Sequence, residues 1–393
     1  MRNPLVRQNK YLHDRPHRRR PPFLLRGASA KLNGGIAGAV SAVGLLIALA
    51  LFPAVAVAQS ALPKIVNPAP ASAGAQYWTP ERMTTAIPKD VQLSGSPTLS
   101  GAASAPTGTP GVAGGSPPAG QAPSEGPPVP LEALSPSQRP QPLDGPYAGP
   151  HDTYQYGPDY LAYPISTVGK LFFTEPGIGD FVCSATVTYG GGAPNVIWTA
   201  GHCVANGGAA TFYTNWLFCP SYDADLGGPN PSIGCWDWVS ATTSAEWYYN
   251  GAFTRDYAMI GLSDCGTVYC QDIVTVTGGL GFAWNWARDQ HWHHFGYPAA
   301  SPYTGGKIIT TAAEHRYDDA PDRLGPPTNS WGSSQTGGSS GSALQLFFSY
   351  AGGYINGNVS YGYDNLPGEL YGPYVDTQVC DFWRINTGWP GTC

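Results

Sequence analysis

Charged residues are scarce in this chain of 393 residues, of which only 12% are Asp, Glu, Lys or Arg. Nine of the twenty basic residues lie in residues 1–35, together with a single acidic residue. Beyond residue 58 there remain 11 basic and 25 acidic residues (20 − 9 and 26 − 1), a net charge of −14. Because nucleic-acid-binding domains need a basic face, this balance excludes a nucleic acid partner.

Cysteine is absent from the first 182 residues, and no CxxC pair with zinc spacing occurs anywhere. An even number of cysteines in an exported chain predicts four disulfides in an oxidising compartment, with the pairing left open by counting alone. The eight cysteines are Cys183, Cys203, Cys219, Cys235, Cys265, Cys270, Cys380 and Cys393. The run His-Trp-His-His at 291–294 lacks a further ligand motif, so we expect no metal and no other cofactor.

The N-terminus has the pattern of an export signal. Residues 1–35 are basic, residues 36–58 are apolar, and Ala56-Val57-Ala58 provides small residues before Gln59. This predicts a signal peptide over 1–58 with a long basic region, and hence a secreted protein. The apolar run is also long enough to span a bilayer, so an uncleaved membrane anchor over 36–58 is the alternative.

Residues 59–150 are dominated by Pro, Ala, Gly and Ser and show little apolar periodicity. Such a segment buries too little apolar surface to offset the entropy of ordering it. We therefore expect a disordered linker or propeptide here, followed by one folded domain over 151–393.

The remaining chain reads as closely spaced strands bounded by Gly, Pro, Asn or Asp, which predicts an all-β sandwich or pair of barrels. Only the tail VDTQVCDFWRINTG is helix-like. The expected strands cover 168–174, 181–189, 195–201, 257–262, 272–277, 307–312, 343–350 and 352–362.

Histidine is absent after His315, and this absence decides between two serine motifs. GGSSG at 337–341 fits the G-x-S-x-G nucleophile elbow, which would make Ser339 the nucleophile, but that class needs a later histidine. An order of His202, Asp256 and Ser340 remains possible. Asp256 opens an apolar strand, where a carboxylate needs hydrogen bonds, and a neutral imidazole would supply one.

Three blocks carry a resemblance to a known family. TAGHCV (199–204), DYAMIGL (256–262) and GGSSGSAL (337–344) resemble, in order, the catalytic blocks of chymotrypsin-like serine proteases, with His202, Asp256 and Ser340 separated by 54 and 84 residues. Together with GKLFF and FGYP, they are most similar to the exported bacterial branch that includes glutamyl endopeptidases. The resemblance covers about residues 160–393.

The resemblance implies two antiparallel six-stranded β-barrels, over about 160–278 and 279–393, with the active site in the cleft between them. Ser340 would be the nucleophile, His202 its general base, and Asp256 the residue that orients His202. The backbone N–H groups of Gly338 and Ser340 would form the oxyanion hole. Cys183 and Cys203 match the family's disulfide beside the catalytic histidine.

The resemblance also suggests a substrate pocket. Ser334 would form its floor, Ser360 would hydrogen-bond the catalytic aspartate, and Tyr361 and Gly362 would line the cleft. A neutral Ser334 lacks the carboxylate that a preference for Lys or Arg requires, so we expect an apolar or aromatic side chain there. The sequon at Asn358-Val359-Ser360 is discounted because the resemblance buries it.

Two positions depart from the family pattern. Ser339 replaces the aspartate that pairs with a freed N-terminal amine in activated relatives, so maturation would depend instead on removing 59–150. Val359 replaces the histidine usual in the glutamyl branch.

These observations predict a secreted, monomeric serine endopeptidase acting on proteins or peptides, without a cofactor, and in contact with a membrane only if residues 36–58 are retained. The alternative is a non-catalytic binding or surface-attached protein built on the same scaffold.

Overall fold

The computed structural model describes residues 62–68, 73–98, 104–120, 151–155, 158–349 and 351–393, all of which belong to one compact unit spanning Gln59–Cys393. The predicted signal peptide and possible anchor lie outside the described residues. No helix in the described part of the chain is long and apolar enough to cross a membrane.

Six antiparallel strands close into a first barrel. They follow one another in the order β12–β11–β6–β7–β8–β13, and β13 pairs back onto β12. Because the barrel is closed, each of the six strands is paired on both sides and the sheet has no open edge. The strands are β6 (Val168–Glu175), β7 (Gly179–Val187), β8 (Val196–Thr199), β11 (Thr214–Pro220), β12 (Trp236–Thr243) and β13 (Ala258–Gly266). A two-stranded hairpin, β9 (Ala205–Asn206) and β10 (Thr211–Phe212), lies between β8 and β11.

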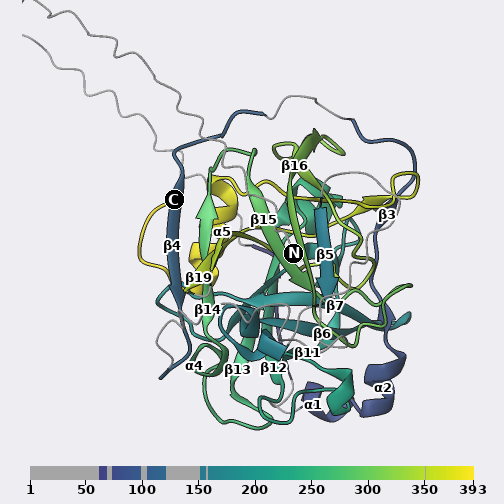
Figure 1. Cartoon of the computed structure of the whole chain (residues 1–393), viewed down its shortest axis with the longest axis vertical. Helices are drawn as coiled ribbons and strands as arrows, with labels where there is room; N and C mark the ends of the chain where they lie inside the picture. The colour runs from purple at the N-terminus through teal and green to yellow at the C-terminus, as the bar shows by residue number, and fades with distance from the viewer. Residues whose placement is uncertain (1–61, 69–72, 99–103, 121–150, 156–157, 350) are drawn as a thin grey trace, which may run out of the picture. The chain divides into compact units, whose positions relative to one another are not determined.

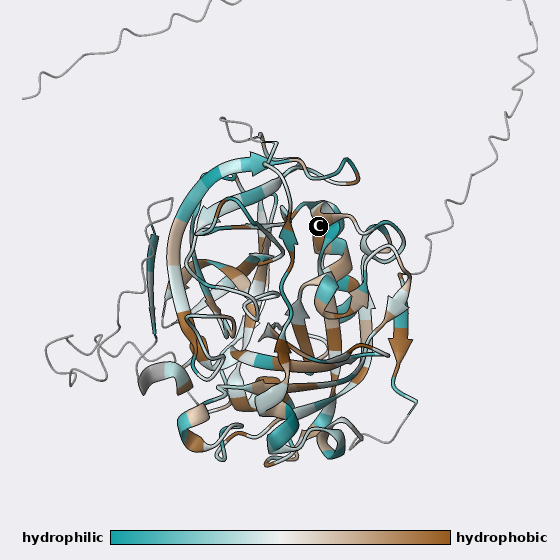
Figure 2. Ribbon diagram, turned by 90° about the vertical axis from the view of Figure 1, so that its right-hand side faces the viewer, coloured by the Kyte–Doolittle hydropathy of each residue, from teal (hydrophilic) through white to brown (hydrophobic). Residues whose placement is uncertain are grey.

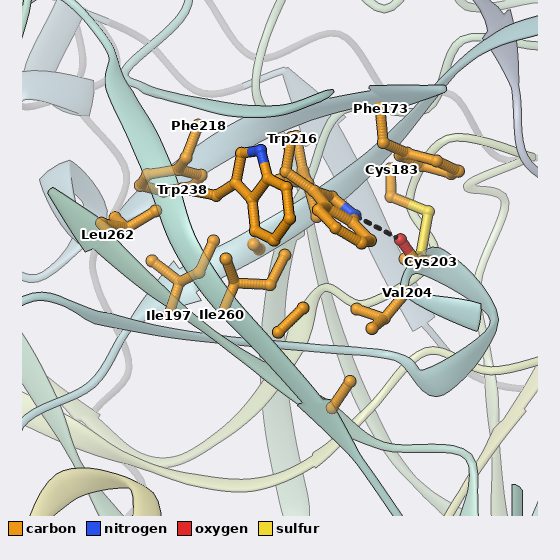
Figure 3. Close-up of a cluster of buried hydrophobic side chains, with 14 of the residues drawn as sticks. Phe173, Cys183, Ile197, Cys203, Val204, Trp216, Phe218, Trp238, Ile260 and Leu262 are labelled. Atoms are coloured by element: carbon orange, nitrogen blue, oxygen red, sulfur yellow. Dashed lines mark hydrogen bonds between the residues drawn. A yellow bond between two sulfur atoms is a disulfide. The ribbon is translucent and has the colours of Figure 1, made fainter. Parts of the chain in front are cut away.

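Aromatic and branched side chains fill this barrel (Figure 3). Trp216 and Trp238 meet edge to face with ring centroids 4.7 Å apart, and both are buried. The indole N–H of Trp216 donates a hydrogen bond of 3.0 Å to the carbonyl of Cys203. The core of the barrel thereby fixes the backbone next to His202.

A nine-stranded sheet makes up the second half of the fold, in the order β21–β17–β16–β15–β18–β19–β14–β4, with β5 also paired to β16. Its pairs are antiparallel except for β14 and β19, which run parallel. Its strands are β4 (Gly111–Ser116), β5 (His151–Gln155), β14 (Gly279–Trp284), β15 (His291–Gly296), β16 (Ile309–Asp319), β17 (Thr328–Gly332), β18 (Ala343–Ser349), β19 (Gly352–Asn358) and β21 (Glu369–Gly372). The closed barrel and this sheet confirm the predicted all-β fold and its first six-stranded barrel. The second half differs from the expected six-stranded barrel, because β4 and β5, from before residue 160, extend it to nine strands. In Figure 2 many of the strands are brown, the colour of hydrophobic residues, over much of their length.

The expectation of disorder over 59–150 is wrong for the stretches that the structure describes. These stretches add strands to both halves: β1 pairs with β12, β2 with β7, β4 with β14, and β3 with β20. Main-chain hydrogen bonds to existing sheet edges order this segment, together with a few buried side chains such as Trp78 and Met83. The added elements are β1 (Lys64–Val66), α1 (Ala73–Tyr77), α2 (Pro80–Thr85), β2 (Ile87–Pro88) and β3 (Gln92–Leu93), and β20 is Gly362–Tyr363. Figure 1 shows α1, α2, β3 and β4 in blue to purple at the periphery of the later strands.

Helices are few and short in the described part of the chain. The helix-like tail is confirmed as α5 (Thr377–Thr387), which Asp376 caps by accepting a hydrogen bond from the Val379 N–H. A second helix, α4 (Ile273–Thr277), lies where the sequence predicts a strand over 272–277. That expectation is wrong because the N–H of Ile273 is bound by the side chain of Asn195, which starts a helical turn that β-branched residues alone would not favour.

All eight cysteines are paired, as Cys183–Cys203, Cys219–Cys235, Cys265–Cys270 and Cys380–Cys393. The pairing suggested by the family resemblance for Cys183 and Cys203 is thus present. The last bridge ties the end of the chain to α5. Each bridge closes a short loop, which stabilises the fold mainly by restricting the unfolded chain.

Lys170 is a buried cation on β6, with only 5% of its surface exposed. Its Nζ donates to the carbonyl of Gly305 at 2.9 Å and lies 4.7 Å from the ring centre of Tyr222. Burial lowers the pKa of Lys170 to about 8, because the charged amine loses its hydration.

Replacement of Lys170 by Met is expected to change the pH dependence of stability. Between pH 8 and 10 the unfolded chain keeps the Lys170 proton while the folded chain has released it, so the free energy of unfolding of the parent rises with pH relative to that of Lys170→Met. The expected slope is roughly 1.4 kcal/mol per pH unit. Urea unfolding of both proteins from pH 7 to 10 measures it, and a difference that does not vary with pH would contradict the assignment.

Candidate active site

His202 lies on a 3₁₀ turn (Gly201–Cys203) directly after β8, and only 2% of it is exposed. Its ring Nδ1 is 2.7 Å from Oδ2 of Asp256, and its backbone N–H donates to Oδ1 of the same carboxylate at 2.7 Å. The Cys183–Cys203 bridge and the Trp216 hydrogen bond to Cys203 hold this turn against the barrel core (Figure 3). The position and orientation of the imidazole are therefore fixed from two sides.

Asp256 is completely buried two residues before β13, and its carboxylate accepts several hydrogen bonds. Besides the two bonds from His202, Oδ2 accepts the hydroxyl of Ser360 at 2.5 Å. The backbone carbonyl of Asp256 accepts the side-chain amide of Asn358 at 3.0 Å. A buried carboxylate needs such donors, and an ionised one can only accept, so Nδ1 of His202 carries the proton.

The segment before Asp256 is anchored to the C-terminal helix. The guanidinium of Arg255 makes two hydrogen bonds, of 3.0 and 2.8 Å, to the carboxylate of Asp376, the residue that caps α5. Both partners are buried. A paired, two-bond contact fixes direction as well as distance, so it restrains the backbone that carries Asp256.

The other ring nitrogen of His202, Nε2, is buried and has no hydrogen-bond partner among the described residues. With the proton held on Nδ1, Nε2 presents a free lone pair. No hydrogen bond joins it to Ser340 in the described part of the chain. Catalytic contacts of this kind are often long before substrate binds and shorten in the complex.

Ser340 lies on the loop before β18 and is held to the first barrel. Its carbonyl accepts the N–H of Ser184 at 2.8 Å, and Ser184 follows Cys183, the disulfide partner of Cys203. The next residue, Gly341, has a φ of +82° and packs against Thr199 and Ala200, which immediately precede the His202 turn. The structure thus brings the Ser340 loop to the strand ends that carry His202.

Gly338 has a φ of +98°, a backbone conformation that a residue with a Cβ rarely adopts. An added Cβ would lie 2.7 Å from the carbonyl oxygen of Tyr297. The Gly338 carbonyl accepts the Ser184 hydroxyl at 2.9 Å, and the Gly338 N–H donates to the carbonyl of Lys89 at 3.2 Å. Only glycine allows the chain to present this N–H at the loop.

The neighbouring serines have structural contacts. Ser339 donates its hydroxyl to the carbonyl of Thr336 at 2.8 Å, and Ser342 donates to the carbonyl of Phe295 at 2.8 Å. Both side chains are buried. These contacts explain why three serines occur together: two of them hold the loop that carries the third.

The predicted pocket residues differ in burial, since Ser360 and Tyr361 are buried whereas Ser334 is partly exposed. The Tyr361 hydroxyl donates to Oδ2 of Asp319 at 2.8 Å. Burial, and next the negative charge of Asp319, raise the pKa of Tyr361 well above its usual value. Gly362 lies on β20. Ser334 is partly exposed, and its hydroxyl is 3.0 Å from that of Tyr303.

Sequence reasoning missed three of these partners. Tyr303 and Asp319 lie in segments without a recognisable motif, so no signal in the sequence could have assigned them. Asn358 was noticed only as part of a discounted sequon, and it is indeed completely buried. Its amide bond to Asp256 gives it a supporting contact in the site instead.

The described residues contain one group of three close metal-binding side chains, Cys183, His202 and Cys203. Because both sulfurs belong to a disulfide, they cannot act as thiolate ligands. In the histidine run, His294 is fully buried, and burial lowers its pKa to about 3. Burial also lowers the pKa of His293, to about 4.

A cavity of about 820 Å³ lies away from this site, between β12, β13 and α5. Tyr257, Met259 and Phe382 are among its lining residues, and it includes none of the predicted catalytic or pocket residues. This cavity is therefore separate from the candidate site around His202.

Comparison with known proteins shows similarity at the level of structure. No family model matches the chain, and no curated protein sequence matches it. The thermostable serine protease AL20 from an extremophilic microorganism is 32% identical, with a TM-score of 0.50 over 57% of this chain and 97% of that one. The protease Anisep from Arthrobacter nicotinovorans is 30% identical, with a TM-score of 0.50 over 57% and 96%. A Glu endopeptidase structure is 18% identical, with a TM-score of 0.47 over 60% and 96%, and we assign no branch from it.

Substitution of Gly338 by Ala is expected to destabilise the protein by about 3 kcal/mol, since both the backbone conformation and the approach to Tyr297 are incompatible with a Cβ. Gly177→Ala is a matched control: its φ is +78°, but no atom lies within 4 Å of an added Cβ. This control should cost about 1 kcal/mol. Urea unfolding measures both, and equal losses would show that the close approach at Gly338 is unimportant.

Proposed function

Because this chain belongs to the chymotrypsin-like serine protease family, we propose that it is a secreted endopeptidase that cleaves proteins or peptides with His202, Asp256 and Ser340. The observation that carries the proposal is the buried His202–Asp256 pair, whose 2.7 Å contact leaves Nε2 of His202 with no hydrogen-bond partner among the residues that the structure describes. With Nδ1 engaged by Asp256, Nε2 is the ring nitrogen that can accept a proton from a nucleophile.

The proposed reaction has two halves. Ser340 Oγ forms a bond to the carbonyl carbon of the peptide while its proton passes to Nε2 of His202. His202 then gives that proton to the departing amine as the C–N bond breaks, which leaves an acyl-enzyme. Water, deprotonated by His202, attacks the ester and releases the acid, and the proton returns to Ser340.

Asp256 keeps His202 in the required tautomer and stabilises its cationic form without taking the proton itself. The hydroxyl of Ser360 and the amide of Asn358 hold Asp256 in place from the second half of the fold. In the tetrahedral intermediate, negative charge develops on the carbonyl oxygen. We assign its stabilisation to the N–H groups of Gly338 and Ser340, each typically worth about 10²–10³ in rate.

The proposed side-chain pocket is uncharged at its floor. Ser334 and Tyr303 contribute two hydroxyls that hydrogen-bond each other. Neither hydroxyl carries the negative charge that would pair with a Lys or Arg side chain. A pocket of this kind favours an apolar or aromatic residue before the cleaved bond. The four disulfides support a location outside the cytosol, where thiols are oxidised.

Substitution of Ser340 by Ala is expected to abolish labelling by a fluorophosphonate probe and to lower casein hydrolysis by at least about 10⁴-fold, because the attacking oxygen is lost. Ser339→Ala is the matched control, since it removes one hydrogen bond of the same loop, to Thr336, and leaves the attacking oxygen in place. It should keep labelling, with activity lowered by no more than about tenfold, the cost of one neutral hydrogen bond. Labelling that persists in Ser340→Ala would contradict the assignment of the nucleophile.

Cleavage of a peptide library is expected to show Phe, Tyr, Leu or Met before the cut bond, and little cleavage after Lys, Arg or Glu. Mass spectrometry of the products gives this profile directly. Introducing a carboxylate with Ser334→Asp should raise the share of cuts after Lys and Arg, because a carboxylate attracts a cation placed beside it. A parent enzyme that cuts mainly after Glu or Lys would contradict the proposed pocket.

A further inference from the structure

Residues 87–93 (IPKDVQL) cross the candidate active site from one half of the fold to the other. At one end, β2 pairs in parallel with β7 of the first barrel, through Ile87 and Phe181. At the other end, β3 pairs in parallel with β20, through Gln92 and Gly362. A single stretch of seven residues therefore joins the two structural elements between which a substrate would lie.

The middle of this stretch contacts a group needed for the proposed reaction. The carbonyl of Lys89 accepts the N–H of Gly338 at 3.2 Å, and the N–H of Lys89 donates to the carbonyl of Val182 at 2.9 Å. Gly338 is one of the two proposed oxyanion donors. A peptide carbonyl from the chain itself therefore occupies a donor that the substrate carbonyl needs.

The same stretch also covers the predicted wall of the cleft. The N–H of Gly362 donates to the carbonyl of Val91 at 3.0 Å, and the N–H of Asp364 donates to the carbonyl of Leu93 at 3.1 Å. A Cβ added at Gly362 would lie 2.9 Å from the side chain of Gln92. These bonds add a strand to an exposed edge, which is also how extended peptides bind proteins.

Side-chain contacts hold the stretch at Lys89. Its Nζ lies 2.5 Å from the carboxylate of Glu175, and it lies 4.5 and 5.2 Å from the ring centres of Phe181 and Tyr213. The side chains of Lys89 and Glu175 are only 19% and 13% exposed. Moving Lys89 away would leave Glu175 partly desolvated and unpaired, so the pair favours the docked position of the stretch.

Flanking contacts fix the stretch on both sides. Upstream, the buried Trp78 donates its indole N–H to the carbonyl of Asn215 at 2.6 Å, and the Gly74 N–H donates to Asp237 at 2.8 Å. Downstream, the Thr98 N–H donates to Asp319 at 2.7 Å. Because both ends are tied to the folded domain, little further entropy is lost when the stretch enters the cleft.

We propose that residues 87–93 form an autoinhibitory strand that blocks the substrate cleft of the intact chain, an inference that rests on the proposed protease function. The strand engages the Gly338 N–H, and no hydrogen bond joins the Ser340 N–H to it in the described part of the chain. Cleavage requires both donors on one carbonyl, so the strand occupies the cleft without being cut between Lys89 and Asp90. Activity then depends on displacement or removal of the strand.

Substitution of Lys89 by Pro tests this inference in the full chain. Proline removes both the N–H bonded to Val182 and the amine bonded to Glu175. Lys64→Pro is the matched control: Lys64 also follows a proline and lies in an added strand, β1, which pairs with β12 and not with the cleft. We expect fluorophosphonate to label Lys89→Pro about tenfold faster than the parent and Lys64→Pro at the parent's rate, with mass spectrometry confirming intact chains.

Equal labelling of the parent and both variants would overturn autoinhibition and leave the proposed function standing. No labelling of any variant, with all four disulfides formed, would overturn both. Should Lys89→Pro fail to fold, Lys89→Ala with Lys64→Ala as its control replaces it, and a faster rate only for Lys89→Ala is expected.

A capped peptide of residues 87–93 provides an independent measurement. Added to Lys89→Ala protein that reacts with the fluorophosphonate probe, the peptide should slow the hydrolysis of a chromogenic substrate. A scrambled peptide of the same composition should not. Mass spectrometry should recover the peptide uncut. Rapid cleavage between Lys89 and Asp90, or no inhibition by the peptide, would contradict the inference.

Discussion

The buried carboxylate of Asp256 is the constraint on which the rest of the site depends. A fully buried acid must receive hydrogen bonds, and Asp256 receives them from His202 in the first barrel and from Ser360 in the second half of the fold. Satisfying this one group therefore aligns the two halves and sets the tautomer of the histidine. The Arg255–Asp376 pair and the Cys183–Cys203 bridge hold the surrounding backbone to that arrangement.

The segment before residue 151 extends the domain instead of merely preceding it. It adds β1 and β2 to the first barrel and β4 to the second sheet, and it pairs β3 with β20. Edge strands carry unpaired N–H and C=O groups, and added strands satisfy them. In the intact chain, the stability of the fold and access to the cleft are therefore linked through the same segment.

Much of the fold, and the residues of the candidate site, could be predicted from the sequence, because short motifs fix short-range chemistry. The blocks around His202, Asp256 and Ser340 each contain the residues that shape their own turn, and the tail contains its own helix pattern. Strand pairing by residues 64–116 could not be predicted, since a Pro- and Gly-rich segment gains its order from distant sheet edges. Likewise, β-branched residues at 273–277 form a helix because Asn195 binds the first N–H, and Tyr303 meets Ser334 only through the tertiary fold.

Nuclear magnetic resonance of ¹⁵N-histidine-labelled protein tests the central claim most directly, because it locates the proton on His202. The account predicts a strongly downfield imidazole proton on Nδ1, shared with Asp256 and shielded from solvent by burial. This resonance should persist in Ser340→Ala and disappear in Asp256→Asn. A proton found on Nε2 of the neutral His202 ring, or a resonance unchanged in Asp256→Asn, would contradict the account.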